Sequence, residues 1–364
     1  MKALPVLAGA AGMIFVGGSV AVSGHLADAP MYTVQALRYA VACLLLLLWA
    51  HLTRRRPPTS HATRSPYPVR RPPTPHAARS PYPVRRPPTP HAARSPIPHA
   101  ARSPSPVRRP PVLRPRGREW WWLLGVTVTG LVIFNVALVQ GSRHAEPAVI
   151  GVAVACVPIL LAAAGPVLEG RRPAVRVLTA ATVVTAGAML VQGLGRTDAT
   201  GLFWAAVTFA CEAAFTLLAV PVLGRHGPLG VSVHATWLGA AMFAVLGLST
   251  EGPAAVTRIH LDDLLAGAYL AVLVTAVAFL LWYTCVARLG TGRAGLLTGL
   301  APIAAAATGV ALGGPLPSPA VWLGITTVAA GLALGLSTPT PPITPAPTTP
   351  APRPGWSPPL SQRR

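Results

Sequence analysis

The residues best suited to chemistry in this chain are the few ionisable side chains that interrupt long apolar segments. Glu212 lies in TFACEAAFTLLAVP, and Arg38 lies in ALRYAVACLLLLLWA. A charged side chain at the centre of a bilayer costs about 2.5–3.5 kcal/mol on insertion scales, so it is expected to face a partner or a water-filled cavity. Glu212 and Arg38 are therefore the first candidates for binding a solute or for exchanging protons.

Two interpretations of Glu212 remain open. On the wall of a cavity, its carboxyl group can exchange protons with a solute-binding site. Alternatively, Glu212 faces Arg38, and the ion pair only orients the two apolar segments that carry these residues. Arg38 lies closer to the end of its segment than Glu212 does, so a direct pair requires both side chains to be extended.

Other polar side chains within apolar segments are candidates for lining the same pocket. They are Asn135, Gln140, Trp282, Tyr283 and Thr298. Together they suit a small amphipathic solute. Each of them can instead form a hydrogen bond between helices or anchor a helix at the membrane interface.

Two prolines stand at matching places in two similar apolar segments. Pro158 lies in AVIGVAVACVPILLAAAGPVLE, and Pro302 lies in GRAGLLTGLAPIAAAATGVALGG. Proline removes a backbone donor and leaves a carbonyl free, which produces either a simple kink or a hinge at the site. A broken helix that recurs later in the chain indicates two homologous halves, the organisation found in secondary transporters.

The composition predicts that these residues lie on membrane-spanning helices. Of the residues, 52% are hydrophobic and 11% are charged, whereas a soluble domain has about 25% charged residues. Ten apolar segments approach the roughly 20 residues needed to cross a bilayer. These are Leu4–Gly24, Met31–Leu52, Trp120–Gln140, Ala148–Leu168, Ala174–Leu194, Gly201–Leu223, Gly230–Ser249, Leu264–Ala287, Gly292–Leu312 and Ala320–Leu336.

The distribution of basic residues predicts the orientation of the ten helices. With the N-terminus inside, 26 of the 30 basic residues fall on the cytoplasmic side, three fall outside and Arg38 lies within the membrane. Without the 16 basic residues at 53–118 the ratio is still 10 to three. Both termini are then cytoplasmic, and because five is odd, the two halves enter the bilayer in opposite senses. The predicted fold is an all-α, 5+5 inverted repeat of ten transmembrane helices in the plasma or inner membrane.

An insertion between the second and third helices interrupts this pattern. HATRSPYPVRRPPTP at 61–75 recurs with a period of 15 residues. Its many prolines and few aliphatic residues predict a disordered cytoplasmic loop with local polyproline II structure. Attraction of its arginines to anionic lipids is an alternative role, whereas the absence of a recognisable module argues against nucleic-acid binding. The proline- and threonine-rich tail is also expected to be disordered.

The predicted units follow from these features. They are helices 1–2 at 1–52, the disordered loop at 53–118, helices 3–5 at 119–195, helices 6–10 at 196–337 and the tail at 338–364. Four cysteines are scattered one to an apolar segment, which indicates no metal or cofactor site. Gly295/Gly299, Gly309/Gly313 and Gly331/Gly335 are small-xxx-small pairs, suited either to the packed core or to a homodimer.

Together these features resemble the EamA-type transporters of the drug/metabolite transporter superfamily. The resemblance rests on ten helices in two halves, an arginine in the second helix, prolines in helices four and nine, and LEGRRP closing helix four. One departure is that Gly313 and Gly314 stand where Glu169 and Gly170 stand in the first half. The resemblance implies outward transport and proton coupling.

The expected function is therefore secondary transport of a small metabolite or drug-like solute by alternating access, with Glu212 as the proton-coupling candidate. A Walker A loop and the HExxH and GxSxG motifs are absent from the sequence, so no enzymatic activity is predicted. The alternative is a membrane anchor that does not transport, whose arginine-rich loop recruits anionic lipid or a cytoplasmic partner.

Overall fold

The computed structural model describes residues 3–23, 29–54 and 112–337, and these residues form helices and connecting loops without a β-strand. The predicted disorder of the insertion and the tail falls on 55–111 and 338–364, outside the described residues. The α-helices are α1 (Ala3–Ser23), α2 (Met31–Arg54), α3 (Glu119–Thr127), α4 (Phe134–Gly141), α5 (Pro147–Ala155), α6 (Val157–Leu168), α7 (Val175–Gln192), α8 (Ala199–Leu217), α9 (Val220–Thr250), α10 (Leu261–Tyr269), α11 (Ala278–Leu289), α12 (Thr291–Leu296), α13 (Leu300–Ala311) and α14 (Pro319–Leu336).

Within the described residues, nine helical segments are long and apolar enough to cross a membrane. They are α2, α3 to α4, α5 to α6, α7, α8, α9, α10 to α11, α12 to α13 and α14. Helix α1 adds a further apolar helix of 21 residues. The all-helical membrane architecture predicted from hydropathy is confirmed.

The predicted sixth membrane segment, Gly201–Leu223, is wrong at its second boundary. Helix α8 ends at Leu217, and the next helix begins at Val220. That helix breaks again at Gly227, which adopts φ 66° immediately before Pro228. Glycine tolerates this left-handed backbone, and proline disfavours a helical conformation at the residue before it. The residues between the two breaks therefore form a short helical piece after a turn at 218–219, which hydropathy alone merged with the preceding span.

Besides α9, four of the long segments contain irregular backbone. Short π-helical stretches, η2 (Val128–Ile133) and η4 (Leu270–Val277), join α3 to α4 and α10 to α11. Helix α5 ends one residue before Cys156, and the 3-10 turn η5 (Leu297–Gly299) separates α12 from α13. Pro158 and Pro302 follow these two breaks closely, as expected for residues that lack a backbone donor.

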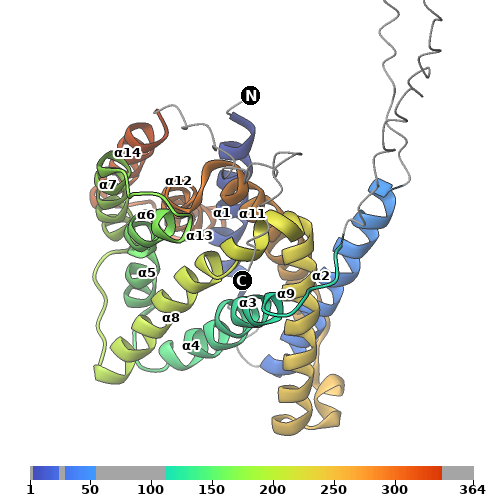
Figure 1. Cartoon of the computed structure of the whole chain (residues 1–364). Helices are drawn as coiled ribbons and strands as arrows, with labels where there is room; N and C mark the ends of the chain where they lie inside the picture. Colours follow the sequence, from blue (N-terminus) through green and yellow to red (C-terminus); the bar gives the residue numbers. More distant parts are fainter. Residues whose placement is uncertain (1–2, 24–28, 55–111, 338–364) are drawn as a thin grey trace, which may run out of the picture.

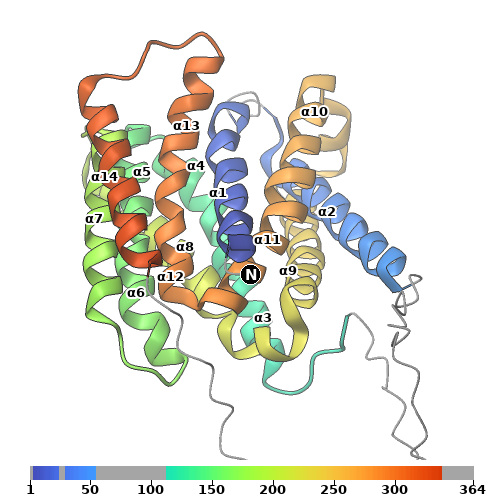
Figure 2. The ribbon, with the colours of Figure 1, turned by 90° about the horizontal axis from the view of Figure 1, so that it is seen from above.

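The helices are arranged so that segments far apart in the sequence lie side by side (Figures 1 and 2). Helix α7 packs along α14 at one flank of the bundle, and α2 packs along α9 at the other. Helix α1 lies against α11 and α13, while α8 lies against α4, α5 and α6. The core between them buries large side chains such as Tyr39, Phe243 and Tyr283.

Small residues permit the close approach of these helices. A Cβ atom at Gly331 would lie 2.7 Å from Val184 Cγ2, and one at Gly187 would lie 2.7 Å from the backbone nitrogen of Val328. Gly295 similarly faces Leu161, whereas Gly309 has no such neighbour within 4 Å. Most of the predicted glycine pairs therefore serve packing within the chain.

Candidate functional site

Arg38 is the centre of a polar cluster inside the helix bundle. Its Nε donates a hydrogen bond to Thr275 Oγ1 at 2.9 Å, and its Nη1 donates to Gln35 Oε1 at 3.2 Å. Its Cζ atom lies 5.1 Å from the ring centroid of Tyr39. The structure does not pair Arg38 with Glu212, so the interpretation of these two residues as a direct ion pair is wrong here.

Asn135 extends this cluster to the third membrane segment. Its Oδ1 accepts a hydrogen bond from Gln35 Nε2 at 2.9 Å, while its Nδ2 donates to Tyr39 Oη at 3.1 Å and to the Leu131 carbonyl at 2.6 Å. The structure thus joins two residues predicted from the sequence, Arg38 and Asn135. Their partners Gln35, Tyr39 and Thr275 were not predicted.

The cluster is built on the two π-helical stretches. Leu131, whose carbonyl accepts from Asn135, belongs to η2, and Thr275 belongs to η4. Thr275 Oγ1 also donates to the Leu270 carbonyl at 2.9 Å, five residues earlier in the chain. Stretches of π-helix inside longer helices occur frequently at functional sites. Here they place polar side chains within otherwise apolar segments.

Glu212 lies apart from that cluster, on the face of α8 that packs into the bundle. The side chains one turn to either side on this face, Thr208 and Phe215, are buried, while Glu212 itself is half-buried. No hydrogen bond or ion pair links its carboxylate to another described residue. A carboxyl group in this position suits proton exchange better than a structural ion pair.

Trp282 and Tyr283 tie α11 to α8 beside Glu212. Trp282 Nε1 donates to Thr216 Oγ1 at 3.0 Å, and Tyr283 Oη donates to the Phe215 carbonyl at 3.2 Å. Both aromatic side chains are buried. Their polar atoms are occupied by the neighbouring helix, which supports the interpretation of interhelical hydrogen bonds over that of pocket lining.

The remaining predicted polar residues lie elsewhere. Gln140 is near the end of α4, where its Oε1 accepts from Arg143 Nη1 at 3.4 Å. Thr298 is buried and donates to the Gly295 carbonyl at 2.8 Å. Neither residue hydrogen-bonds to the Arg38 cluster, and the polar positions chosen from the sequence separate into distinct groups.

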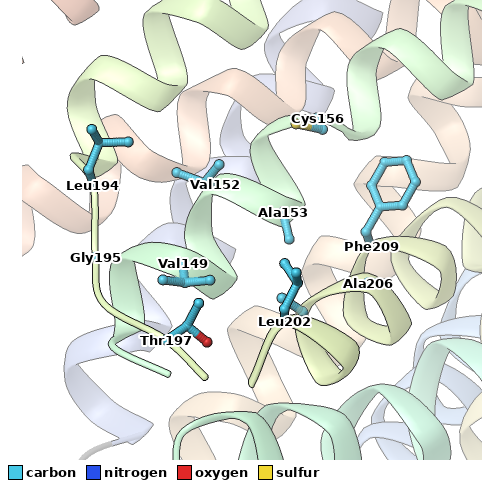
Figure 3. A pocket seen from close by; sticks show the side chains of 11 residues that line it. Val149, Val152, Ala153, Cys156, Leu194, Gly195, Thr197, Leu202, Ala206 and Phe209 are labelled. Carbon is cyan, nitrogen blue, oxygen red and sulfur yellow. The ribbon is translucent and has the colours of Figure 1, made fainter. Parts of the chain in front are cut away.

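A cavity of about 460 Å³ opens between α5 and α8 (Figure 3). Its walls are mainly apolar. Val149 and Val152 of α5, with Cys156 directly after α5, lie opposite Leu202 and Phe209 of α8. Cys156 marks the break before Pro158, and Phe209 lies three residues before Glu212 on the same helix. The cavity suits an apolar group. Sequence reasoning did not detect it, because it forms only where two helices diverge.

Ion pairs fix the loops beside the mouth of this cavity. Glu146 Oε1 accepts a hydrogen bond from Arg196 Nε at 2.9 Å, and this hydrogen bond lowers the pKa of the Glu146 carboxyl. Asp198 Oδ1 accepts from the backbone N–H of Gly201 at 2.7 Å, which lowers the pKa of Asp198, and His144 contributes in the same direction. These carboxylates cap and cross-link exposed loops, where water screens such ion pairs and they contribute little to stability.

Two further carboxylates cap helices from distant parts of the chain. Glu169 Oε1 accepts from the backbone N–H and from Oγ1 of Thr291, both at 2.8 Å, at the start of α12. Glu251 accepts from the N–H groups of Tyr32 at 2.8 Å and of Thr33 at 2.9 Å, at the start of α2. A negative charge at a helix N-terminus satisfies free donors and complements the helix dipole. Each contact joins the first half of the chain to the second.

Among the described residues, no cluster of three or more histidine, cysteine, aspartate or glutamate side chains is arranged to hold a metal ion. The chemistry available to the site is therefore that of one guanidinium with neutral polar neighbours, one carboxyl group and an apolar cavity.

Comparisons with known proteins agree with this architecture. Residues 199–337 match the EamA-like transporter family. The chain is 26% identical over 190 residues to an uncharacterised transporter, YetK, of Bacillus subtilis, covering 50% of this chain and 58% of the relative's length. It is 24% identical over 221 residues to a probable terminal-alkyne amino-acid exporter of Streptantibioticus cattleyicolor, covering 58% of this chain and 72% of that protein.

A solved structure, described only as the crystal structure of a protein, shares the fold. The two superpose with a TM-score of 0.65 at 16% identity, over 91% of this chain and 96% of the other. Residues 199–337 and the transporter relatives make the chain similar to the EamA-type transporters, and the apolar helices of the described residues indicate a multi-pass membrane protein.

Proposed function

We propose that this protein is a secondary transporter that exports a small amphipathic solute across the cytoplasmic membrane by alternating access. The observation that carries the proposal is the matched pattern of helix irregularities. The third and eighth membrane segments each contain a π-helical stretch, and the fourth and ninth are each broken just before a proline. Such paired broken helices surround the substrate sites of transporters built from inverted repeats.

The contacts between helices support two five-helix halves of opposite sense. Helix α1 packs on α13, as α8 packs on α5 and α6, and α2 contacts η4, as α9 contacts η2. Helices α7 and α14, the last of each half, pack on each other. The matched family region, 199–337, is close to the proposed second half at 196–337. Under the positive-inside rule both termini are cytoplasmic.

For the substrate class we propose a solute of amino-acid size. One relative is named a probable exporter of a terminal-alkyne amino acid, and the apolar cavity beside α8 can accept a short hydrocarbon side chain. The direct test is export from cells that overproduce the chain, compared with cells that carry an empty vector. Faster loss of preloaded neutral amino acids from the overproducing cells is expected. Equal rates across a broad panel of small solutes would contradict the proposal.

Glu212 is the proposed proton-coupling group. It faces into the bundle, is half-buried and has no ion-pair partner among the described residues. Substitution Glu212→Gln keeps the size of the side chain but removes its titratable proton. In proteoliposomes we expect the variant to lose the dependence of transport on a pH gradient, while solute exchange without a gradient persists. A variant that responds to the gradient as the unmodified protein does would remove Glu212 from the mechanism.

The alternative of a lipid-recruiting anchor is not favoured by the family match or by the relatives, which are transporters. The arginine repeats on which it depends lie outside the described residues. Any attraction of this loop to anionic lipid would accompany transport rather than replace it.

A further inference from the structure

We propose that Arg38, held by Gln35 and Thr275, is the binding site for the carboxylate group of the transported solute. This inference rests on the proposed transport function and adds the chemical class of the substrate. It also assigns the position at which the charged end of the solute is recognised.

The hydrogen bonds around Arg38 leave one edge of its guanidinium group free. The group carries five donors in a planar fork. Nε and Nη1 each donate to a neighbour, while Nη2 donates to no described residue. Among the described side chains, the only fully buried nitrogen or oxygen atom without a hydrogen-bond partner is His226 Nδ1. Nη2 of Arg38 has no partner either, so it is not fully buried. Together with Nη1 it forms a planar edge of the kind that binds a carboxylate through two parallel hydrogen bonds.

The neighbours of Arg38 orient the guanidinium without neutralising it. Thr275 donates its own proton to the Leu270 carbonyl, so a lone pair of its hydroxyl faces Arg38 Nε. Gln35 donates its amide to Asn135, so its carbonyl oxygen faces Arg38 Nη1. Asn135 is held in turn by the Leu131 carbonyl in η2. Each chain of hydrogen bonds thus donates in one direction, from Arg38 toward a backbone carbonyl of one of the two π-helical stretches.

A positive charge without a counter-ion remains at this point of the apolar bundle. No carboxylate of the described chain lies within 4 Å of Arg38. Glu251, the acid at the N-terminus of the same helix, is engaged by Tyr32 and Thr33. Membrane-embedded charges are normally paired or face a solvated cavity. The carboxylate group of a bound solute supplies the missing negative charge.

The position of the partners shows that Arg38 points into the bundle rather than into lipid. Thr275 is fully buried, and Asn135 is 9% exposed. The three residues come from the second, third and eighth membrane segments. A purely structural role, in which Arg38 only ties α2 to η4, uses the same contacts but does not predict any preference among solutes. The test below separates these roles.

The test measures binding to the purified full-length protein, independently of transport. The probes are matched pairs: acetate and acetamide, butyrate and butyramide, L-alanine and L-alaninamide, L-norvaline and L-norvalinamide. Their binding is measured by the shift in thermal unfolding temperature across a concentration series. We expect at least one carboxylate to stabilise the protein, and each amide to bind about tenfold or more weakly than its acid, because it lacks the charge that Arg38 recognises.

Substitutions identify Arg38 as the source of this preference. Arg38→Gln should remove the difference between acid and amide, and Arg38→Lys should retain only part of it, because an ammonium group lacks the planar fork. Thr275→Val should weaken acid binding several-fold by releasing Nε. Arg172→Gln, which removes an exposed arginine from a loop, is the matched control and should keep the full preference.

The outcomes are distinct from those of the export assay. Equal binding of acids and amides to the unmodified protein, or an Arg38→Gln variant that retains the preference, overturns the carboxylate site even if export occurs. Should Arg38→Gln fail to fold, the acid preference of Arg38→Lys and Thr275→Val decides, and an undiminished preference in both overturns the site. A clear acid preference without export would instead contradict the proposed transport function alone.

Discussion

At the scale of single residues, the structure divides the polar side chains of the membrane segments by whether their hydrogen-bonding groups are already used. Some polar groups are already used: Trp282 and Tyr283 donate to acceptors on α8, and Thr298 donates to the Gly295 carbonyl in its own segment. Arg38 and Glu212 retain unused capacity and lie on different segments. The candidates for recognition and for proton coupling are therefore these two charges, separately rather than as a pair.

Glu169 provides a prediction at this scale. Substitution Glu169→Ala removes the acceptor for both donors of Thr291 at the start of α12. Loss of a helix N-cap costs about 1 kcal/mol, so the purified variant should unfold at a lower denaturant concentration. Arg171 forms an ion pair with Glu169 but is about half exposed. Arg171→Gln is the control and should change stability by less than about 0.5 kcal/mol. Equal losses in both variants would show that the ion pair, not the cap, stabilises this junction.

At the scale of elements, the bundle depends on close approach between helices from opposite halves. Helices α7 and α14 pack through Gly187, Gly324 and Gly331, where an added Cβ would meet atoms of the facing helix. Because lipid tails are as apolar as the helices, close packing rather than hydrophobic burial drives such association in a membrane. The positions of small residues therefore matter more here than overall hydropathy.

Gly331→Leu tests this contact. The new side chain would displace Val184, and overpacking of this kind typically costs about 1–3 kcal/mol. We expect a lower yield of folded protein and a lower thermal unfolding temperature in detergent. Gly309→Leu is the control, because a Cβ at Gly309 has no such neighbour within 4 Å. If both variants lose stability equally, the destabilisation comes from leucine itself and not from the α7 to α14 contact.

At the scale of the whole molecule, the proposed transport unit is the helical bundle, and we expect it to transport without the arginine-rich insertion. Helix α2 ends at Arg54 and the described chain resumes at Val112. Carboxylates that directly follow α6 and α9 cap helices from distant parts of the chain. Within the described residues, these long-range contacts lie at the ends of helices and in their short connections.

Deletion of residues 60–111 tests this separation. We expect the shortened chain to insert into the membrane and to export solute at a rate close to that of the full chain, since the described helices that carry the Arg38 cluster and the cavity pack directly on one another. Export per molecule, normalised to the amount of protein in the membrane, is the quantity to compare. A large loss of export by correctly inserted protein would revive the recruitment hypothesis for the loop.

The sequence by itself determined the membrane-spanning helices and two of the places where they break, beside Pro158 and Pro302. These features are local: a bilayer requires each segment to satisfy its own backbone hydrogen bonds, so apolar length and proline positions suffice to predict them. The predicted boundary at Leu223 was wrong, because apolar residues continue across the turn between Leu217 and Val220 into the next helix.

Only the tertiary structure decided which polar residues meet. Arg38 reaches Thr275 across 237 positions of sequence, and Gln35 reaches Asn135 across 100. Side-chain partners depend on which helix faces arrive at the same depth, and hydropathy contains no information about rotation or neighbour order. For the same reason the sequence suggested a pairing of Arg38 with Glu212, whereas packing gave each charge a different environment.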